Sequence, residues 1–327
     1  MTSGFSYTVY DVSELTQAEV YGHVLVELGY EHPEIVLLTA DLAKSTKTSV
    51  FFKEFPERSF NFGIAEQNMM SAAAGFAITG KLPFVSTMAV FATMRACEQL
   101  RTDIAYPNLN VKIVATHAGL SMGVGGTTHH CTEDIAITRS MANMTVVVPA
   151  DSIETGKVVR AAIKHKGPLY VRVGRGFEPM AYESDEYEYE IGKSVLMRDG
   201  KDVTVIACGV CVLAGVEAAY ELKDNDGVDL RVINMHTIKP IDREAIIKAA
   251  RETGCIVTAE EHNILGGLGS AVAEVLAEEG IAIKFKRLGL PDVYSVIGYP
   301  EDLYARYEID TAGIYKGIRE VLGIESV

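Results

Sequence analysis

The side chain of Glu66 is a first candidate for proton chemistry, because it lies near the start of an expected helix, IAEQNMMSAAAGFAITG. The small residues from Ser71 to Gly75 let another backbone approach closely, so we expect this helix to be buried in a sheet or a subunit interface. A buried carboxylate is costly unless it has a dedicated hydrogen-bond partner or is tuned for proton transfer. The alternative is that Glu66 only stabilises the helix N-terminus electrostatically.

A glycine-rich loop with histidines at both ends, HAGLSMGVGGTTHHC, covers residues 117–131. It follows an expected strand, and open α/β sheets usually bind ligands where their strands end. Its glycines allow a ligand to approach the backbone closely. The imidazoles predict proton transfer or hydrogen bonding to a substrate. The alternatives are incidental histidines in a flexible loop, or a zinc site, although the adjacent pair fits usual ligand spacings poorly. The zinc ligands would be His117, His129, His130 and Cys131.

Two further segments place charged or reactive side chains after expected strands. Arg175 in VRVGRGF ends a strand in the same sense as the histidine loop, so it is a candidate for binding an anion on this acidic chain. The segment CGVC, residues 208–211, follows a strand and precedes a helix, as a redox pair would. Buried structural cysteines give the same pattern, so both interpretations stay open.

Helix-like and strand-like patterns alternate along nearly the whole chain. The expected strands, such as EIVLLTADL and VKIVATHAG, are unbroken apolar runs, which favours parallel sheets covered on both faces by helices. Residues 177–190, FEPMAYESDEYEYE, are acidic and have no apolar period, which is typical of a solvated linker. The sequence therefore predicts an α/β fold with two doubly wound domains, residues 1–184 and 185–327.

Composition narrows the class of partner. The 327 residues are 48% hydrophobic and carry a formal net charge of -14. Such a surface repels phosphate backbones and anionic lipids, so we expect neither nucleic acid nor a membrane as a partner. Five cysteines, an odd number, favour a reducing compartment over a disulfide framework. The apolar runs are too short to span a bilayer and no signal-peptide pattern occurs, so we expect a cytoplasmic protein.

Several segments of the chain resemble the C-terminal half of transketolase, in the same order. They are DLAKSTKT, FNFGIAEQNMMSAAAGFA, LPFVSTMAVFATMRACEQLR, VPADSIET and RLGLPDVYSVIG, and GIAEQNMM is the most specific of them. The resemblance covers essentially the whole chain. It implies a thiamine-diphosphate pyrimidine-binding domain followed by the transketolase C-terminal domain. It also implies a transferase that moves a two-carbon ketol unit from a phosphorylated ketose to an aldose.

The resemblance gives Glu66 a catalytic role toward the cofactor. The glutamate of this motif accepts a hydrogen bond from N1' of the aminopyrimidine, which favours the imino tautomer that removes the C2 proton of the thiazolium. The aromatic ring of Phe91 would stack on the pyrimidine. The cofactor-binding set that the resemblance implies is Glu66, Phe91, Asp41, Met88 and Met94.

The resemblance also implies residues that bind the sugar. Ser45 and Arg175 would bind phosphate. His117 and His129, twelve residues apart, would bind substrate hydroxyls and relay protons, which makes them catalytic together with Glu66.

The family's site for Mg²⁺ and the diphosphate is missing, because no GDG segment followed by an Asn occurs. The resemblance therefore implies that this chain has no metal ligands and that a separate N-terminal transketolase subunit supplies them. It further implies an α2β2 heterotetramer in which this chain also pairs with itself.

Two departures from the family pattern predict an unusual sugar substrate. Val124, Gly125 and Gly126 stand where the family has an acidic residue, Asp and Gly. An Arg that helps to bind phosphate in the family falls near Ala18, with Gln17 beside it. A hydrogen bond to a charged group contributes about 1.5–3 kcal/mol, so both losses would weaken binding of the family's usual sugars.

Three other functions compete with a split transketolase. The beta subunit of a 2-oxo acid dehydrogenase's decarboxylase has a similar length and pair of domains and would share Glu66. A deoxyxylulose-phosphate synthase fits less well, since that family keeps both halves in one chain. A non-catalytic assembly subunit would explain the two departures, but not the retained Glu66, Phe91, His117 and His129.

Overall fold

The computed structural model describes residues 15–176 and 178–324. Its contacts divide the chain into two compact units, and the division is not a single cut. The first unit contains the chain up to Ala118 together with Thr138–Tyr189. The second contains Gly119–Ile137 together with Glu190–Val327. The glycine-rich loop therefore belongs to the second unit, although it is inserted in the sequence of the first.

The first unit is built on parallel strands. In sheet order they are β5 (Thr145–Val147), β6 (Leu169–Arg172), β4 (Lys112–Thr116), β3 (Leu82–Met88), β1 (Ile35–Thr39) and β2 (Ser59–Asn61). Every residue of β1, β4, β5 and β6 is buried. Continuous apolar strands of this kind occur where helices cover both faces of a sheet.

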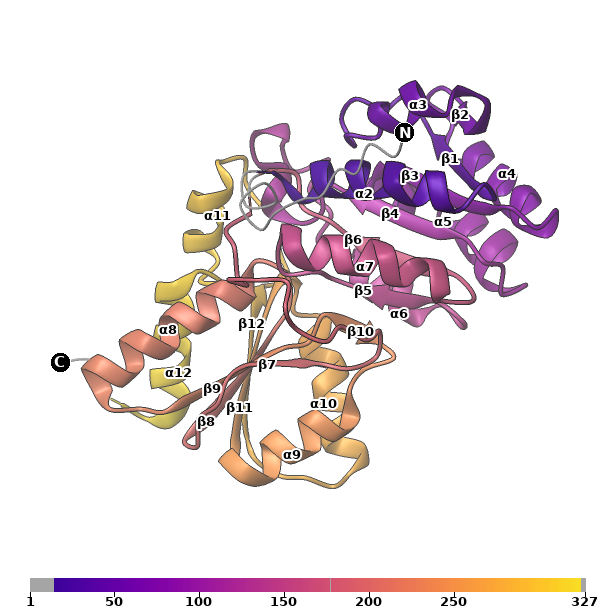
Figure 1. Ribbon diagram of the computed structural model, residues 1–327. Coiled ribbons are helices and arrows are strands. Elements are labelled where there is room, and N and C mark those ends of the chain that lie inside the picture. The colour runs from indigo at the N-terminus through magenta and orange to yellow at the C-terminus, as the bar shows by residue number, and fades with distance from the viewer. Residues whose placement is uncertain (1–14, 177, 325–327) are drawn as a thin grey trace. The chain divides into compact units, whose positions relative to one another are not determined.

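Helices connect these strands. They are α2 (Gln17–Glu31), α3 (Ser49–Glu54), α4 (Glu66–Ile78), α5 (Cys97–Gln99), α6 (Asp134–Ser140) and α7 (Ser152–Lys164), with a 3₁₀ turn η1 (Pro56–Arg58). Helices α2 and α7 lie side by side over one face of the first sheet (Figure 1). The segment between β3 and β4 contains two π-helical turns, η2 (Phe91–Arg95) and η3 (Leu100–Ala105), around α5. Such wide turns occur frequently at functional sites.

The second unit has a sheet with strand order β12 (Lys284–Leu290), β11 (Cys255–Asn263), β8 (Val203–Ala207), β9 (Leu230–Asn234) and β7 (Val195–Arg198). Only β7 in this sheet is antiparallel to its neighbour. The other elements are η4 (Leu120–Gly125), β10 (Thr237–Lys239), α8 (Cys211–Asp226), α9 (Arg243–Thr253), α10 (Leu268–Glu278), α11 (Pro300–Arg306) and α12 (Thr311–Leu322). Helices α8 and α12 lie on one side of this sheet and α9 and α10 on the other (Figure 1). The predicted α/β fold with two doubly wound domains is confirmed.

The acidic segment before the second unit is held against the first. Tyr182 and Tyr187 stack with parallel rings 4.2 Å apart. Their hydroxyls donate to Glu154 Oε1, at 3.2 and 3.4 Å. Asp151 caps α7 and also accepts the backbone N–H of Ala181 and Tyr182, each at 2.9 Å. Part of the predicted solvated linker is therefore packed structure.

Candidate active site

Glu66 is the first residue of α4, and its side chain is 1% exposed. Its Oε2 accepts a hydrogen bond from Arg95 Nη1 at 2.9 Å, and the Arg95 side chain is 43% exposed. The buried carboxylate therefore has the dedicated hydrogen-bond partner that it needs, and this partner approaches from the solvent side. The positive end of α4 adds to the stabilisation of its negative charge.

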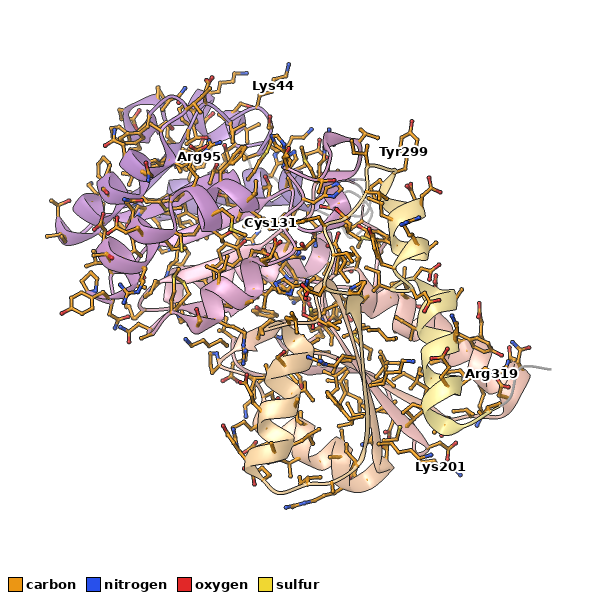
Figure 2. All side chains as sticks on the ribbon, turned by 180° about the vertical axis from the view of Figure 1, so that it is seen from behind. Lys44, Arg95, Cys131, Lys201, Tyr299 and Arg319 are labelled. Carbon is orange, nitrogen blue, oxygen red and sulfur yellow. The ribbon has the colours of Figure 1, made fainter. Side chains whose placement is uncertain are left out.

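Arg95 also brings Phe91 to the same place. The guanidinium carbon of Arg95 (Figure 2) lies 4.1 Å from the centroid of the Phe91 ring. Both residues belong to the π-helical turn η2. A planar N–H donor thus contacts Glu66 while lying over an aromatic face. A planar ring with an N–H donor can use the same acceptor and the same aromatic face. Met88 is half-buried at the end of β3, and Met94, in η2, is 44% exposed.

Four of the predicted residues lie at or just after the carboxyl ends of neighbouring strands of the first sheet. Asp41 follows β1, Met88 ends β3, His117 follows β4 and Arg175 follows β6. Because β1, β3, β4 and β6 are adjacent and parallel, these residues share one edge of the sheet. This is the edge at which open α/β sheets bind ligands.

Asp41 adopts a left-handed backbone conformation with φ of 60°. Its backbone N–H donates to Asn61 Oδ1 at 2.9 Å, and the same oxygen accepts the N–H of Gly63 at 3.0 Å. Asn61 therefore ties the loop after β1 to the segment that leads into α4. Ser45 lies further along this loop and is exposed.

His117 is buried, with 6% of its surface exposed, and has a φ of 59°. A non-glycine residue in this region is strained, and such strain clusters at functional sites. Its Nδ1 is hydrogen-bonded to Thr116 Oγ1 at 2.8 Å, which leaves Nε2 as the nitrogen that can meet a substrate. Burial lowers the pKa of His117 to about 4, with further lowering by the positive charges of Arg175 and Lys47. The imidazole is therefore neutral near pH 7.

Arg175 and His117 come from segments that touch. The His117 N–H donates to Gly174 O at 3.4 Å, and the side chain of Arg175 is exposed. Gln17, beside the Ala18 at which the sequence departs from the family pattern, is 3% exposed and accepts the N–H of Gly174 at 2.8 Å. Its amide group donates to Pro149 O at 3.2 Å. Gln17 thus holds the backbone next to Arg175.

His129 belongs to the second unit and is half-buried. Its Nδ1 is hydrogen-bonded to Thr128 Oγ1 at 3.0 Å. Earlier in the same loop, a Cβ added to Gly125 would lie 2.2 Å from Met122 Cε. That atom is the flexible end of the Met122 side chain, and Gly125 itself is exposed.

The structure gives no ligand set for the zinc alternative. His130 Nε2 donates to Gly123 O at 2.8 Å, and Nδ1 accepts from the Ser295 hydroxyl. Across residues 15–176 and 178–324, no group of three or more His, Cys, Asp or Glu side chains is placed to hold a metal ion. Cys131 is fully buried at the base of the loop (Figure 2), and Cys208 and Cys211 are buried as free thiols.

Sequence reasoning missed three residues that the structure brings to these sites. Arg95 lies 29 positions from Glu66, and only the wide turns of η2 bring it there. Lys47 was visible in the polar KSTKTS loop, but its effect on His117 was not. Glu261 lies in AEEHN, at the end of the buried strand β11. Acidic residues inside a buried strand are a sequence signal for a carboxylate with a specific hydrogen-bonding role.

Comparison with known proteins decides the family. The transketolase pyrimidine-binding domain matches residues 13–177, and the transketolase C-terminal domain matches residues 192–314. The chain belongs to the transketolase family. It corresponds to the C-terminal subunit of a split transketolase.

Three similar proteins match this chain over nearly the whole length of both chains. The chain is 47% identical over 301 residues to a Methanocaldococcus jannaschii protein provisionally named as a transketolase C-terminal section, covering 92% of this chain and 94% of that one. It is 40% identical over 292 residues to one of the subunits of an apulose-4-phosphate transketolase from Phocaeicola vulgatus, covering 89% and 93%. A solved structure, described as a split-gene transketolase in an inactive beta4 tetramer, is 46% identical with a TM-score of 0.86, covering 95% and 99%.

In the described part of the chain, no helix has the length and apolar character that crossing a membrane requires.

Proposed function

We propose that this chain is the C-terminal subunit of a thiamine-diphosphate-dependent transketolase that transfers a two-carbon ketol unit from a phosphorylated ketose to an aldose. The observation that carries the proposal is the buried Glu66 carboxylate beside Phe91, already engaged by a planar N–H donor. These side chains fit the cofactor's aminopyrimidine, since Glu66 offers a buried carboxylate acceptor and Phe91 offers an aromatic face. When bound, thiamine diphosphate supplies the carbanion and the electron sink for carbon–carbon cleavage.

The residues of this chain have separable roles in that reaction. Glu66 accepts a hydrogen bond at the pyrimidine ring and keeps its negative charge away from water. Phe91, Met88 and Met94 provide the apolar surface around it, and Asp41 orders the loop beside it. These contacts orient the cofactor and need no metal ligand from this chain.

Substrate binding falls to the sheet edge and the glycine-rich loop. His117, neutral near pH 7, hydrogen-bonds a sugar hydroxyl through Nε2, and Arg175 binds the phosphate together with Ser45. His129 relays protons from the second unit's loop. The sugar differs from the family's usual one, because no acidic side chain stands at Gly125 and no arginine at Ala18, and the neighbouring Gln17 is engaged by Gly174 and Pro149.

The partner is a separate N-terminal transketolase subunit, which provides the diphosphate site and the Mg²⁺ ligands. The assembly is an α2β2 heterotetramer in the cytoplasm. The relative described as an inactive beta4 tetramer supports both self-association of such subunits and the need for a partner.

Calorimetry with thiamine diphosphate and Mg²⁺ tests the proposal. The titration is run on this chain alone, on the N-terminal subunit alone, and on the two mixed. We expect tight binding only to the mixture, followed by turnover of a ketose phosphate such as apulose 4-phosphate. Absence of binding in all three cases would demote the enzyme to an assembly subunit. Turnover of pyruvate instead of a ketose would favour the 2-oxo acid dehydrogenase subunit.

A further inference from the structure

The loop Gly119–Cys131, which carries His129, is closed at its base. The Gly119 N–H donates to Cys131 O at 2.9 Å, in an isolated antiparallel bridge. Within the loop, three glycines have positive φ: 58° at Gly119, 60° at Gly123 and 89° at Gly126. Glycines lose more conformational freedom on ordering than any other residue, so the loop needs anchors outside itself to hold one conformation.

Two of these anchors hold the end of the loop and the residue that follows it. Ser295 accepts the Thr127 hydroxyl at its backbone oxygen, at 2.6 Å, and donates its own hydroxyl to His130. Just past the loop, Thr132 O accepts the N–H of Asn263 at 2.8 Å. These contacts fix the half of the loop that follows Gly126.

The first half of the loop is anchored by a buried carboxylate. Glu261, on β11, is 5% exposed, and its Oε1 accepts the backbone N–H of Ser121 at 2.7 Å. The same oxygen accepts the hydroxyl of Tyr304, on α11, at 3.2 Å. Hydrogen bonds to a charged acceptor are about twice as strong as neutral ones, more so away from water. Nothing in the cofactor chemistry proposed above uses this carboxylate.

We infer that Glu261 is a positioning residue for the substrate-binding loop: its carboxylate holds η4, and through η4 the glycine turn that presents His129. The inference rests on the proposed function for the role of His129, but its structural part stands on the contacts of the second unit alone. The C-terminal domain then contributes to catalysis by ordering a substrate-binding segment inserted from the domain before it.

Glu260 provides a matched control on the same strand. It is also fully buried, and it accepts two backbone N–H groups, those of Leu268 at 2.7 Å and Gly269 at 2.8 Å. These bonds cap the N-terminus of α10 and do not involve the loop. Glu260→Gln and Glu261→Gln therefore make the same chemical change, one residue apart, at different targets.

Amide hydrogen exchange on the full chain, alone and with its partner, tests the inference without reference to activity. Glu261→Leu removes the acceptor, so we expect exchange in residues 120–130 to accelerate by roughly 10-fold or more. Glu261→Gln keeps an acceptor oxygen and should restore most of the protection. Glu260→Gln should accelerate exchange only at the start of α10. If Glu261→Leu does not fold, Tyr304→Phe removes a hydroxyl that holds the carboxylate and should accelerate exchange in the same residues by a smaller factor. Wild-type protection of the loop in Glu261→Leu, or in Tyr304→Phe where Glu261→Leu does not fold, would overturn the inference.

Kinetics of the assembled enzyme supply the second readout. Glu261→Leu should lower kcat/KM for the donor ketose by roughly 10–100-fold, with the affinity for thiamine diphosphate unchanged. Glu261→Gln should rescue most of the loss, and Glu260→Gln should leave the donor KM unaltered. A loss of cofactor affinity that parallels the kinetic loss would show a general structural defect and refute the positioning role. If the wild-type complex has no ketol transferase activity, the proposed function fails, while hydrogen exchange still decides the role of Glu261 in the loop.

Discussion

At the scale of single residues, the candidate site depends on charges kept out of water. The Glu66 side chain is 1% exposed, and its partner Arg95, whose side chain is 43% exposed, reaches it from solvent. In the free chain this ion pair satisfies a carboxylate that would otherwise be costly to bury. Under the proposed function, an N–H donor of the cofactor ring gives this carboxylate a second partner besides Arg95, which contacts Oε2.

Replacing Glu66 by Gln should therefore separate folding from function. The Gln side-chain oxygen still accepts a hydrogen bond from Arg95, so we expect the free energy of unfolding to change by less than about 1.5 kcal/mol. Turnover by the assembled complex should fall by about 10²-fold or more, because the acceptor loses its charge. Urea denaturation and steady-state kinetics on the same preparation check both halves. Unchanged turnover would sink the proposed role.

The sequence was informative about this residue and less so about its surroundings. The small side chains after Glu66 indicated burial, and the strand-end positions of His117 and Arg175 indicated a shared edge, because parallel strands end on the same side. The strained backbone of His117 and the electrostatic effect of Lys47 on its pKa depend on tertiary packing, which no local pattern encodes. The same holds for Gln17, whose role follows from a hydrogen bond to Gly174, 157 positions away.

At the scale of elements, helix α7 does more than cover its sheet. Its N-cap Asp151 accepts the N–H of Glu154, as a capping residue should, and also two amides of the segment that leads out of the first unit. The acidic composition of that segment predicted a solvated linker. Composition alone does not predict this packing, because it depends on a distant acceptor. Two tyrosines of the segment, five residues apart, stack on each other and donate to a carboxylate on α7.

Asp151→Ala should therefore cost more than the loss of an ordinary helix cap. An N-cap replacement costs about 1 kcal/mol, and each buried donor left unsatisfied costs about 1–3 kcal/mol more. Asp310→Ala is the matched control, since Asp310 caps α12 by accepting the N–H of Gly313 at 2.9 Å. Urea denaturation compares the two variants, and limited proteolysis should cut the Asp151 variant faster within residues 178–190. Equal stability losses would contradict the double role.

At the scale of the whole molecule, buried histidines link stability to pH. Burial lowers the pKa of His236 to about 4, as it does for His117. In the unfolded chain both titrate near 6.5, so between about pH 6.5 and 4 the unfolded state binds more protons than the folded state. Stability must then rise with pH across this window, and it is lost as the pH falls toward 4.

Urea denaturation between pH 4.5 and 7.5 checks this slope. Each such histidine adds up to about 1.4 kcal/mol per pH unit. His236→Gln should flatten the slope by one histidine's share, and its effect at pH 7.5, where the imidazole is neutral in both states, measures the change in packing alone. A slope identical to that of the wild type would show that the pKa of His236 is the same in the folded and unfolded states.

The division of the chain also has a consequence for the order in which the protein becomes ordered during synthesis. Ser121 and Glu261 are 140 residues apart in the chain, and Ser295 is synthesised later still. At about 5–20 residues per second, the ribosome reaches Glu261 roughly 7–30 s after it has added Ser121. The six strands of the first unit, up to Arg172, are synthesised well before Glu261, so the histidine loop lacks its carboxylate anchor until β11 emerges. A segment from the first half of the chain is thus among the last to become ordered.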